Sequence, residues 1–256
     1  MVSVDDLLAM YLDSHASAGH TEGTITWYRY ELTRFFAWLR AAGLQRSDWL
    51  QLSVIERYLA SSRDDGNAPA TVAGHYRALK GFFNWLVDRG YLKVSPLLGV
   101  KAPKIPKKSP RRAQLEEYIS LIDSISSESW INARDRLIIS TLFLCGLRLG
   151  EVCRLTSSDY MIPQHLLRVR VGKGGHERLV PLLPSVEKSL VAFLFVRPQW
   201  PAESLFLSAN GAGQPTGVIL PNGVRQMLRR RCKRAGLRLL NPHSFRHGLA
   251  MYVLNA

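Results

Sequence analysis

A break in the hydrophobic pattern close to the middle of the chain most constrains how this sequence can fold. Residues 95–110 contain four prolines and four lysines and show no apolar periodicity. Proline fixes φ and lacks a backbone donor, so neither a regular helix nor a central strand continues through such a segment. We expect residues 95–112 to form a basic, Pro-rich, extended linker. It divides the 256 residues into two domains, residues 1–94 and 113–256, each long enough for a core of its own.

The first domain has the apolar spacing of helices. Four segments, residues 4–18, 24–42, 48–62 and 70–89, place apolar side chains at a 3.6-residue period and are separated by short polar or Gly-containing breaks. Helices joined by short turns pack as antiparallel neighbours. The sequence therefore predicts a compact N-terminal helical bundle.

The second domain mixes two periodicities. From His165 the period changes to two, with apolar side chains alternating against arginines up to a Gly-Lys-Gly-Gly turn, which predicts a small antiparallel sheet. Helices are expected over residues 114–125, 132–145, 184–196 and 222–235, and a strand running into a Gly-rich loop over residues 205–217. We therefore expect a mainly α fold with a small antiparallel β-sheet, of the α+β class.

Positive charge is concentrated in the second half of the chain. Residues 1–106 carry 12 Lys and Arg against 10 Asp and Glu, whereas the remaining residues carry 22 against 10. Such an excess indicates a polyanionic partner, and nucleic acid is favoured over an anionic membrane because the sequence lacks a long basic amphipathic helix with an aromatic face. Ribosomal or merely solubilising charge is the alternative that composition leaves open.

The cysteines and the N-terminus exclude other classes. Cys145, Cys153 and Cys232 form no C-x-x-C pair and have no His at zinc-finger spacing, so neither a disulfide framework nor a metal site is expected. The most apolar run, residues 137–147, is too short to span a bilayer, and the N-terminus lacks the pattern of a signal peptide. We expect a cytoplasmic protein.

The heptapeptide Asn-Pro-His-Ser-Phe-Arg-His at residues 241–247 is the first candidate site. Asn241 suits a helix cap and Pro242 the first turn, so His243 and Arg246 would share one helix face. A guanidinium that neutralises phosphate oxygens beside an imidazole that moves a proton fits chemistry on a phosphodiester. A capped surface helix with an extended arginine explains the same motif in isolation.

Two further motifs lie upstream. Residues 145–152 read Cys-Gly-Leu-Arg-Leu-Gly-Glu-Val, which places Arg148 in a turn with Glu151 three residues later. Residues 171–182 read Val-Gly-Lys-Gly-Gly-His-Glu-Arg-Leu-Val-Pro-Leu and put Lys173 at the tip of the expected hairpin. With these three motifs in this order, the chain resembles the tyrosine recombinase, or phage integrase, family over nearly its whole length.

The resemblance implies a role for each motif residue. Arg148 and Arg246 match the two family arginines that hold the scissile phosphate, and Lys173 matches the lysine that acts as general acid toward the 5′-hydroxyl. His243 matches the histidine that assists removal of a proton from the nucleophile. The Gly-Lys-Gly element is not a P-loop, because it lacks the preceding Gly-x-x-x-x-Gly spacing and a following Ser or Thr.

Two more residues have supporting roles in the same comparison. Glu151 matches an acidic position that orients the first arginine. His247 also fits the family pattern, and we expect it to support the helix rather than to take part in the chemistry.

By resemblance, the function is that of a site-specific DNA recombinase or integrase, which cuts and rejoins strands through a 3′-phosphotyrosyl intermediate. Arginines supply the charge stabilisation, and the phosphotyrosine conserves the bond energy, so the scheme requires no cofactor and no metal. The implied partners are double-stranded DNA and, for a full-length protein, copies of itself in a DNA-bound synaptic tetramer.

Basic side chains outside the motifs are candidates for DNA contact. Arg77 and Lys80 lie at helical spacing on the polar face of the expected fourth helix, and the family's N-terminal domain clamps one side of the duplex. A solvated helix face and a solvated linker explain these charges equally well. The linker candidates are Lys107, Lys108, Arg111 and Arg112.

The chain departs from the family pattern after its last motif. In the family a nucleophilic tyrosine lies well beyond the second arginine, and here the sequence given ends at Ala256, soon after Arg246. Tyr252 lies within the expected motif helix and Tyr160 before the sheet, so both are expected to be structural. We expect a recombinase that lacks its nucleophile segment and is inactive alone. A DNA-binding accessory or decoy protein without catalytic activity is the alternative, and a type IB topoisomerase shares the chemistry.

Overall fold

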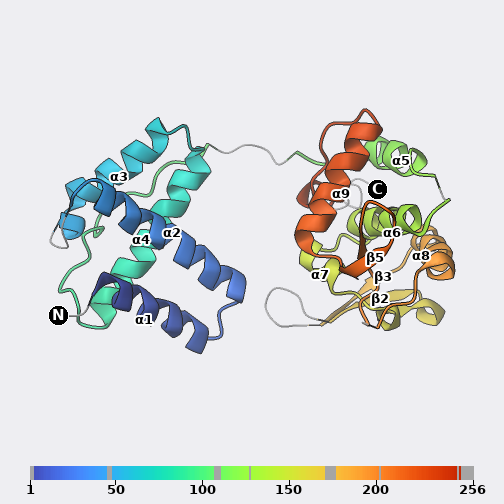
Figure 1. The fold of residues 1–256 in the computed structure, drawn as a ribbon, viewed down its shortest axis with the longest axis horizontal. Coiled ribbons are helices and arrows are strands. Elements are labelled where there is room, and N and C mark those ends of the chain that lie inside the picture. Colours follow the sequence, from blue (N-terminus) through green and yellow to red (C-terminus); the bar gives the residue numbers. More distant parts are fainter. Residues whose placement is uncertain are drawn as a thin grey trace. The chain divides into compact units, whose positions relative to one another are not determined.

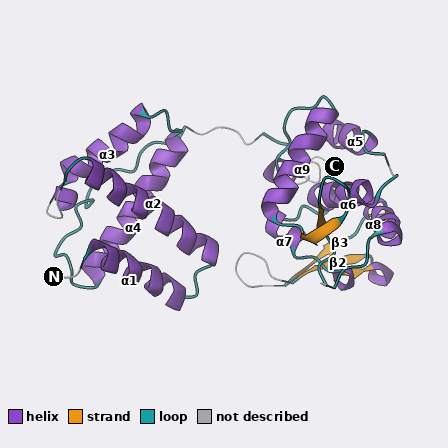
Figure 2. Ribbon diagram, in the orientation of Figure 1, coloured by secondary structure: helices purple, strands orange, loops and turns teal. Residues whose placement is uncertain are grey.

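The chain folds into two compact units, Met1–Lys108 and Ser109–Ala256. The computed structural model describes residues 3–44, 48–106, 111–126, 128–170, 177–201, 203–246 and 248. Figure 1 shows each unit with its helices and strands, and Figure 2 shows the described strands confined to the second unit. The mainly helical fold with small antiparallel sheets agrees with the predicted class.

The first unit is a bundle of helices. Ser3 and Thr21 cap the first two helices, since their side chains accept from Asp6 and Thr24 backbone N–H groups. Its core is rich in aromatic side chains, with Phe35, Phe82 and Phe83 fully buried. The four predicted helices are confirmed, although the third is preceded by a short 3-10 turn. The elements are α1 (Val4–Ser17), α2 (Glu22–Ala41), η1 (Asp48–Leu50), α3 (Leu52–Asp64) and α4 (Pro69–Asp88).

The beginning of the expected linker is packed rather than extended into solvent. Leu97 is only 2% exposed and belongs to the core of the first unit. The Tyr76 hydroxyl donates to the Val100 carbonyl at 2.6 Å. Pro and Lys are the commonest residues of the expected linker, but one buried leucine and one backbone acceptor hold its beginning on the bundle.

The second unit combines helices with two small sheets. In the first sheet, with strand order β1-β2-β3, Leu167 pairs with Val180 in antiparallel register. The predicted strand over residues 205–217 is instead a hairpin, because a second strand, β5, follows the turn and pairs with β4. The helices are α5 (Leu115–Asp123), α6 (Trp130–Leu144), α7 (Leu149–Cys153), α8 (Pro184–Val196) and α9 (Pro221–Arg234). The strands are β1 (Tyr160–Met161), β2 (Leu166–Val169), β3 (Arg178–Pro181), β4 (Leu207–Ala209) and β5 (Pro215–Val218), with 3-10 turns η2 (Ser157–Asp159) and η3 (Ile162–Gln164).

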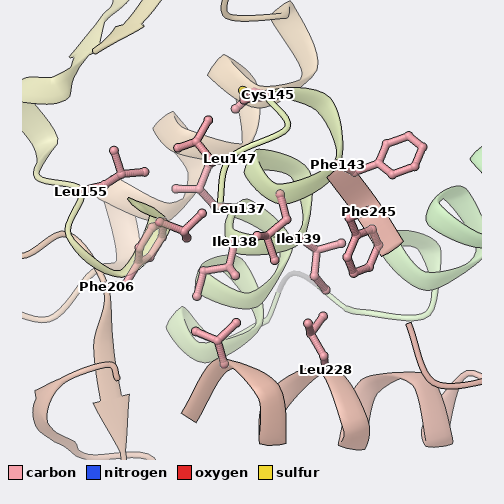
Figure 3. Packing of buried hydrophobic residues seen from close by; sticks show 14 of the residues in the cluster. Leu137, Ile138, Ile139, Phe143, Cys145, Leu147, Leu155, Phe206, Leu228 and Phe245 are labelled. Carbon is pink, nitrogen blue, oxygen red and sulfur yellow. The ribbon is translucent and has the colours of Figure 1, made fainter. Parts of the chain in front are cut away.

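Helix α6 forms the centre of the second core. Its residues Leu137, Ile138 and Ile139 are fully buried. Figure 3 shows Ile139 beside Phe245 of the heptapeptide, with Leu228 of α9 below. A helix that is apolar on most faces must be covered on most sides, and here α8, α9 and the heptapeptide cover it. None of the described helices is both long enough and apolar enough to cross a bilayer.

Candidate functional site

The turn after α6 positions Arg148. Gly146 has a φ of 59°, a left-handed conformation that favours glycine, and it lets the chain reverse between α6 and α7. Arg148 then lies at the N-cap of α7, with extended backbone angles. Its backbone N–H donates to Glu151 Oε2 at 2.8 Å. The Gly-Leu-Arg-Leu-Gly-Glu motif is therefore a capped helix start that fixes the backbone of its arginine.

Glu151 is held by two arginines. Its side chain is 2% exposed and accepts from Arg148 Nη1 at 3.0 Å. Arg178, on β3, donates from Nη1 to Oε1 at 3.0 Å and from Nη2 to Oε2 at 2.7 Å. Burial alone would raise the pKa of Glu151, but the hydrogen bonds from Arg178 and Arg148 lower the pKa to about 2. Glu151 is therefore a carboxylate at neutral pH and orients both guanidiniums.

The heptapeptide starts a short helical segment over residues 242–246. The Asn241 Oδ1 atom accepts from the Ser244 backbone N–H at 2.9 Å, as predicted for a cap. Phe245 is fully buried and contacts Phe143 edge to face. This anchoring directs the next side chain, Arg246, back toward the turn after α6. There its Nη1 atom donates to the Gly146 carbonyl.

Arg246 lies in a concentration of positive charge. Partial burial lowers the pKa of Arg246, and repulsion from Arg148 and Arg178 lowers it further, while Glu151 opposes the shift. A guanidinium remains protonated in proteins at neutral pH, so the three arginines face each other as cations with one carboxylate among them. Such an arrangement favours the approach of an anion.

Arg148 of the Gly-Leu-Arg-Leu-Gly-Glu motif and Arg246 of the heptapeptide line one cavity of about 370 Å³. Arg148, His243 and Arg246 contribute to its wall, so the structure brings together three of the four residues expected to be catalytic. Arg225 and Arg229 of α9 line the same cavity. The remaining wall is largely apolar and includes leucines of the α6–α7 turn, of α9 and of the segment that follows α9.

Arg178, Arg225 and Arg229 were not predicted as site residues. Arg225 and Arg229 lie four residues apart on α9, beside its buried apolar stripe, and this spacing was the available signal. Arg178 had a weaker signal, because the alternating pattern of β3 does not reveal which carboxylate its side chain meets.

The remaining predicted residues have different positions. Lys173, His247, Lys107 and Lys108 lie outside the described residues. Arg111 and Arg112 are exposed in the second unit, and the Arg112 carbonyl accepts from Arg238 Nη2 at 2.5 Å.

Arg77 and Lys80 are exposed on α4 of the first unit. Each cation lies 5.9 Å from an aromatic ring centroid, Arg77 over Trp27 and Lys80 over Tyr76. The Arg77 Nε atom also donates to the Ala73 carbonyl at 3.3 Å. Both side chains therefore have contacts within the bundle and still present charge to solvent.

The described tyrosines of the second unit have internal hydrogen-bond partners. The Tyr118 hydroxyl contacts Ser140 Oγ, and the Tyr160 hydroxyl contacts Thr141 Oγ1, each at 3.1 Å. Burial raises the pKa of both phenols. Neither tyrosine lines the cavity of the two motifs. Tyr252 lies outside the described residues. Among the described residues, no group of three or more His, Cys, Asp or Glu is arranged to hold a metal ion.

Comparison with known proteins gives consistent matches along the chain. Residues 111–256 match the model of the phage integrase family, and residues 11–90 match the phage integrase N-terminal SAM-like domain. Tyrosine recombinase XerC of Xylella fastidiosa is 27% identical over 99% of this chain and 83% of its own length. XerC of Haemophilus ducreyi is 31% identical over 91% and 75%. A lambda integrase tetramer bound to a Holliday junction has a TM-score of 0.71 at 20% identity, covering 98% of this chain and 73% of that chain.

Proposed function

Because this chain belongs to the phage integrase family of tyrosine recombinases, we propose that it holds the scissile phosphate of double-stranded DNA during site-specific strand cleavage and rejoining. One observation carries the proposal: Arg148 and Arg246, far apart in the sequence, line the same cavity. Two guanidiniums at one cavity match a phosphodiester, since each can donate two hydrogen bonds to its oxygens.

The contacts of both arginines support catalysis as well as binding. Glu151 orients Arg148, and the Gly146 carbonyl orients Arg246, so both donors are directed before DNA arrives. Donors arranged in advance stabilise the charge that develops on a pentacoordinate phosphorus, and removing one such donor costs about 3 kcal/mol in comparable sites. This is the expected contribution of each arginine.

The proton transfers are assigned by the family motif. A tyrosine oxygen attacks the phosphorus, the bond to the 5′ oxygen breaks, and a 3′-phosphotyrosyl bond forms. His243 assists removal of the tyrosine proton, and Lys173 donates a proton to the departing 5′ oxygen. The position of His243 on the wall of the arginine cavity supports its share of this scheme.

Double-stranded DNA is the proposed partner of both units. Arg77 and Lys80 of the first unit and Arg111 and Arg112 of the second are exposed and suited to backbone phosphates. Because the lambda integrase structure holds a tetramer on a Holliday junction, we propose that copies of this recombinase also meet in a DNA-bound tetramer. Lys107 and Lys108 would add charge to the same backbone contacts.

We further infer that the 256-residue chain grips the phosphate without cutting the strand. Tyr118 and Tyr160 have internal hydroxyl partners and do not line the cavity, and we expect Tyr252 to be structural. The alternative function is that of a DNA-binding accessory or decoy protein without catalytic activity.

To test the proposal, a DNA duplex that binds the protein is first selected from a random library. A nicked version of this duplex then traps any covalent intermediate between the protein and DNA. We expect Arg148→Gln and Arg246→Gln to weaken binding by similar factors, whereas Lys188→Gln, which removes an exposed charge on α8, lowers the affinity only slightly. If Arg148→Gln, Arg246→Gln and Lys188→Gln all bound DNA with the same affinity, the proposal that this cavity binds the phosphate would be wrong. The wild-type chain should give no denaturant-resistant adduct, and an adduct abolished by Tyr252→Phe would contradict our inference about the nucleophile.

A further inference from the structure

A second cavity lies beside α9 and is lined by residues of α6, α9 and the β4–β5 hairpin. Its volume is about 490 Å³, and it shares no lining residue with the cavity of the two motifs. Four arginines and one carboxylate line it: Arg134, Arg230, Arg231, Arg234 and Asp135. The two cavities are therefore separate, and both are rich in guanidinium groups.

The floor of this second cavity is a buried charged network. Both Nε and Nη2 of Arg134 donate to Asp135 Oδ1, at 2.9 and 2.6 Å. Both Nε and Nη2 of Arg231 donate to Asp135 Oδ2, at 2.8 and 2.7 Å. The side chains of Arg134, Asp135 and Arg231 are only 4%, 2% and 11% exposed. The positions of these groups are thus fixed from two helices.

The network carries more positive charge than its carboxylate can balance. Two guanidiniums share Asp135, which leaves one excess positive charge in a site with little access to water. Burying an uncompensated charge is costly. Among the described residues that line the cavity, no second carboxylate offsets this charge.

Two more cations surround the opening. Arg230 and Arg234 are exposed at helical spacing on α9, on the flank away from Arg225 and Arg229. Neither has an ion-pair partner among the described residues. A network that only joined α6 to α9 would need no groups beyond Asp135 and its two arginines. It gives no reason for two additional cations at the same opening, whereas an anion would be attracted by all four.

We propose that this second cavity is an anion site that binds a phosphate group. Arg230 and Arg234 bind the phosphate oxygens directly, and the Arg134–Asp135–Arg231 network supplies a fixed positive floor. Guanidinium groups are suited to this ligand because their planar donors match phosphate oxygens. A DNA backbone phosphate and inorganic phosphate share this chemistry. The inference does not rest on the proposed role of the first cavity.

Phosphate titration, followed by NMR of the arginine Nε–Hε groups, tests the site. The Nε groups of Arg134 and Arg231 are hydrogen-bonded to Asp135, so they report locally on this cavity. Sodium phosphate replaces sodium chloride at constant ionic strength, which keeps screening unchanged. We expect saturable shifts of both resonances. Arg230→Gln and Arg234→Gln should each raise the apparent Kd by at least about fivefold, because each variant loses charge-assisted hydrogen bonds to the phosphate.

Lys233→Gln is the matched control, because Lys233 is an exposed cation on α9 that lines neither cavity. It should leave the apparent Kd within about twofold, since diffuse surface charge contributes little. The proposal of a phosphate site would be wrong if the chemical shifts changed without saturation. It would also be wrong if Arg230→Gln, Arg234→Gln and Lys233→Gln altered the titration equally. A titration with duplex DNA then distinguishes a DNA backbone phosphate from inorganic phosphate as the ligand. If DNA shifts the same Nε–Hε resonances and added phosphate reverses the shifts, the ligand is a DNA phosphate. If DNA leaves these resonances unchanged, the ligand is the free anion.

Discussion

Arg178 and Glu151 form a two-point contact between β3 and α7, with Nη1–Oε1 and Nη2–Oε2 distances of 3.0 and 2.7 Å. The same carboxylate accepts from Arg148. Arg178 therefore holds the acid that orients an arginine of the proposed phosphate cavity. This hydrogen bonding raises the pKa of Arg178, consistent with a permanently charged partner.

Replacing Arg178 by lysine should loosen Arg148 without removing any group that touches the phosphate. Lysine keeps the charge but cannot reproduce two parallel hydrogen bonds. We expect Arg178→Lys to cost about 2 kcal/mol of unfolding free energy, because bonds to a buried charge are lost. Binding of DNA should also weaken, less than in Arg148→Gln. Denaturant unfolding and fluorescence anisotropy measure the two effects, with Lys188→Gln as the control. DNA binding unchanged in Arg178→Lys would show that Arg178 does not position Arg148.

Glu151 should make stability depend on acid pH. Its pKa in the folded protein is lowered from 4.5 to about 2, so its stabilising contribution is present above about pH 4.5. This contribution is lost as pH falls toward 2, because protonation then favours the unfolded chain. The contribution is at most about 3 kcal/mol.

The Glu151→Gln variant isolates this contribution from other acidic groups. The unfolding free energy of the wild type should exceed that of Glu151→Gln at pH 7, and the difference should shrink between pH 4.5 and 2. A difference that is constant over this range would contradict the lowered pKa. Urea titrations at several pH values provide the measurement.

Gly248 should tolerate no side chain. A Cβ atom at this position would lie 2.3 Å from the Ala113 carbonyl oxygen and 3.2 Å from Phe143 Cε2. Because backbone cannot yield as a flexible side chain does, we expect Gly248→Ala to cost about 1–3 kcal/mol. DNA binding should fall with it, since the heptapeptide carries Arg246. Gly211→Ala, where the added Cβ meets nothing within 4 Å, is the control. Equal melting temperatures for the two variants would contradict the close contact.

Local periodicity was sufficient to predict most helices, and it failed where a contact depends on distant residues. The span predicted for α8 matches the observed Pro184–Val196, because an initial proline and a continuous apolar face are local signals. Leu97 was assigned to a linker because residues 95–110 are rich in proline and lysine, yet its burial is decided by the bundle against which it packs. The composition of residues 95–110 does not show that the helical bundle offers an apolar surface on which Leu97 can pack.

The candidate site shows the same division. Sequence motifs indicated Arg148, His243 and Arg246, and the structure places all three on one cavity, while their chemical roles stay predictions. The two hydrogen bonds from Arg178 to Glu151 were not predicted, because they link β3 to α7 and depend on the geometry of the sheet. The Arg134–Asp135–Arg231 network was also not predicted, because it links α6 to α9 and helical spacing does not show which distant side chains meet.

DNA binding should depend steeply on salt, and the α9 arginines of the first cavity should account for part of the slope. Each neutralised phosphate releases about one counterion, so removing one contact reduces the slope of log K against log salt by about 1. Arg225 and Arg229 line the same cavity as Arg148 and Arg246. We therefore expect Arg225→Gln and Arg229→Gln each to weaken binding and to reduce the slope by about 1.

Fluorescence anisotropy at several salt concentrations measures these slopes. Lys188→Gln removes the same charge from α8 and lines neither arginine cavity, so it should lower affinity slightly and leave the slope unchanged. If only the net charge of the chain mattered, all three variants would behave alike. Equal slopes in the wild type and in both α9 variants would mean that Arg225 and Arg229 do not contact phosphates, because counterion release counts contacts rather than overall charge.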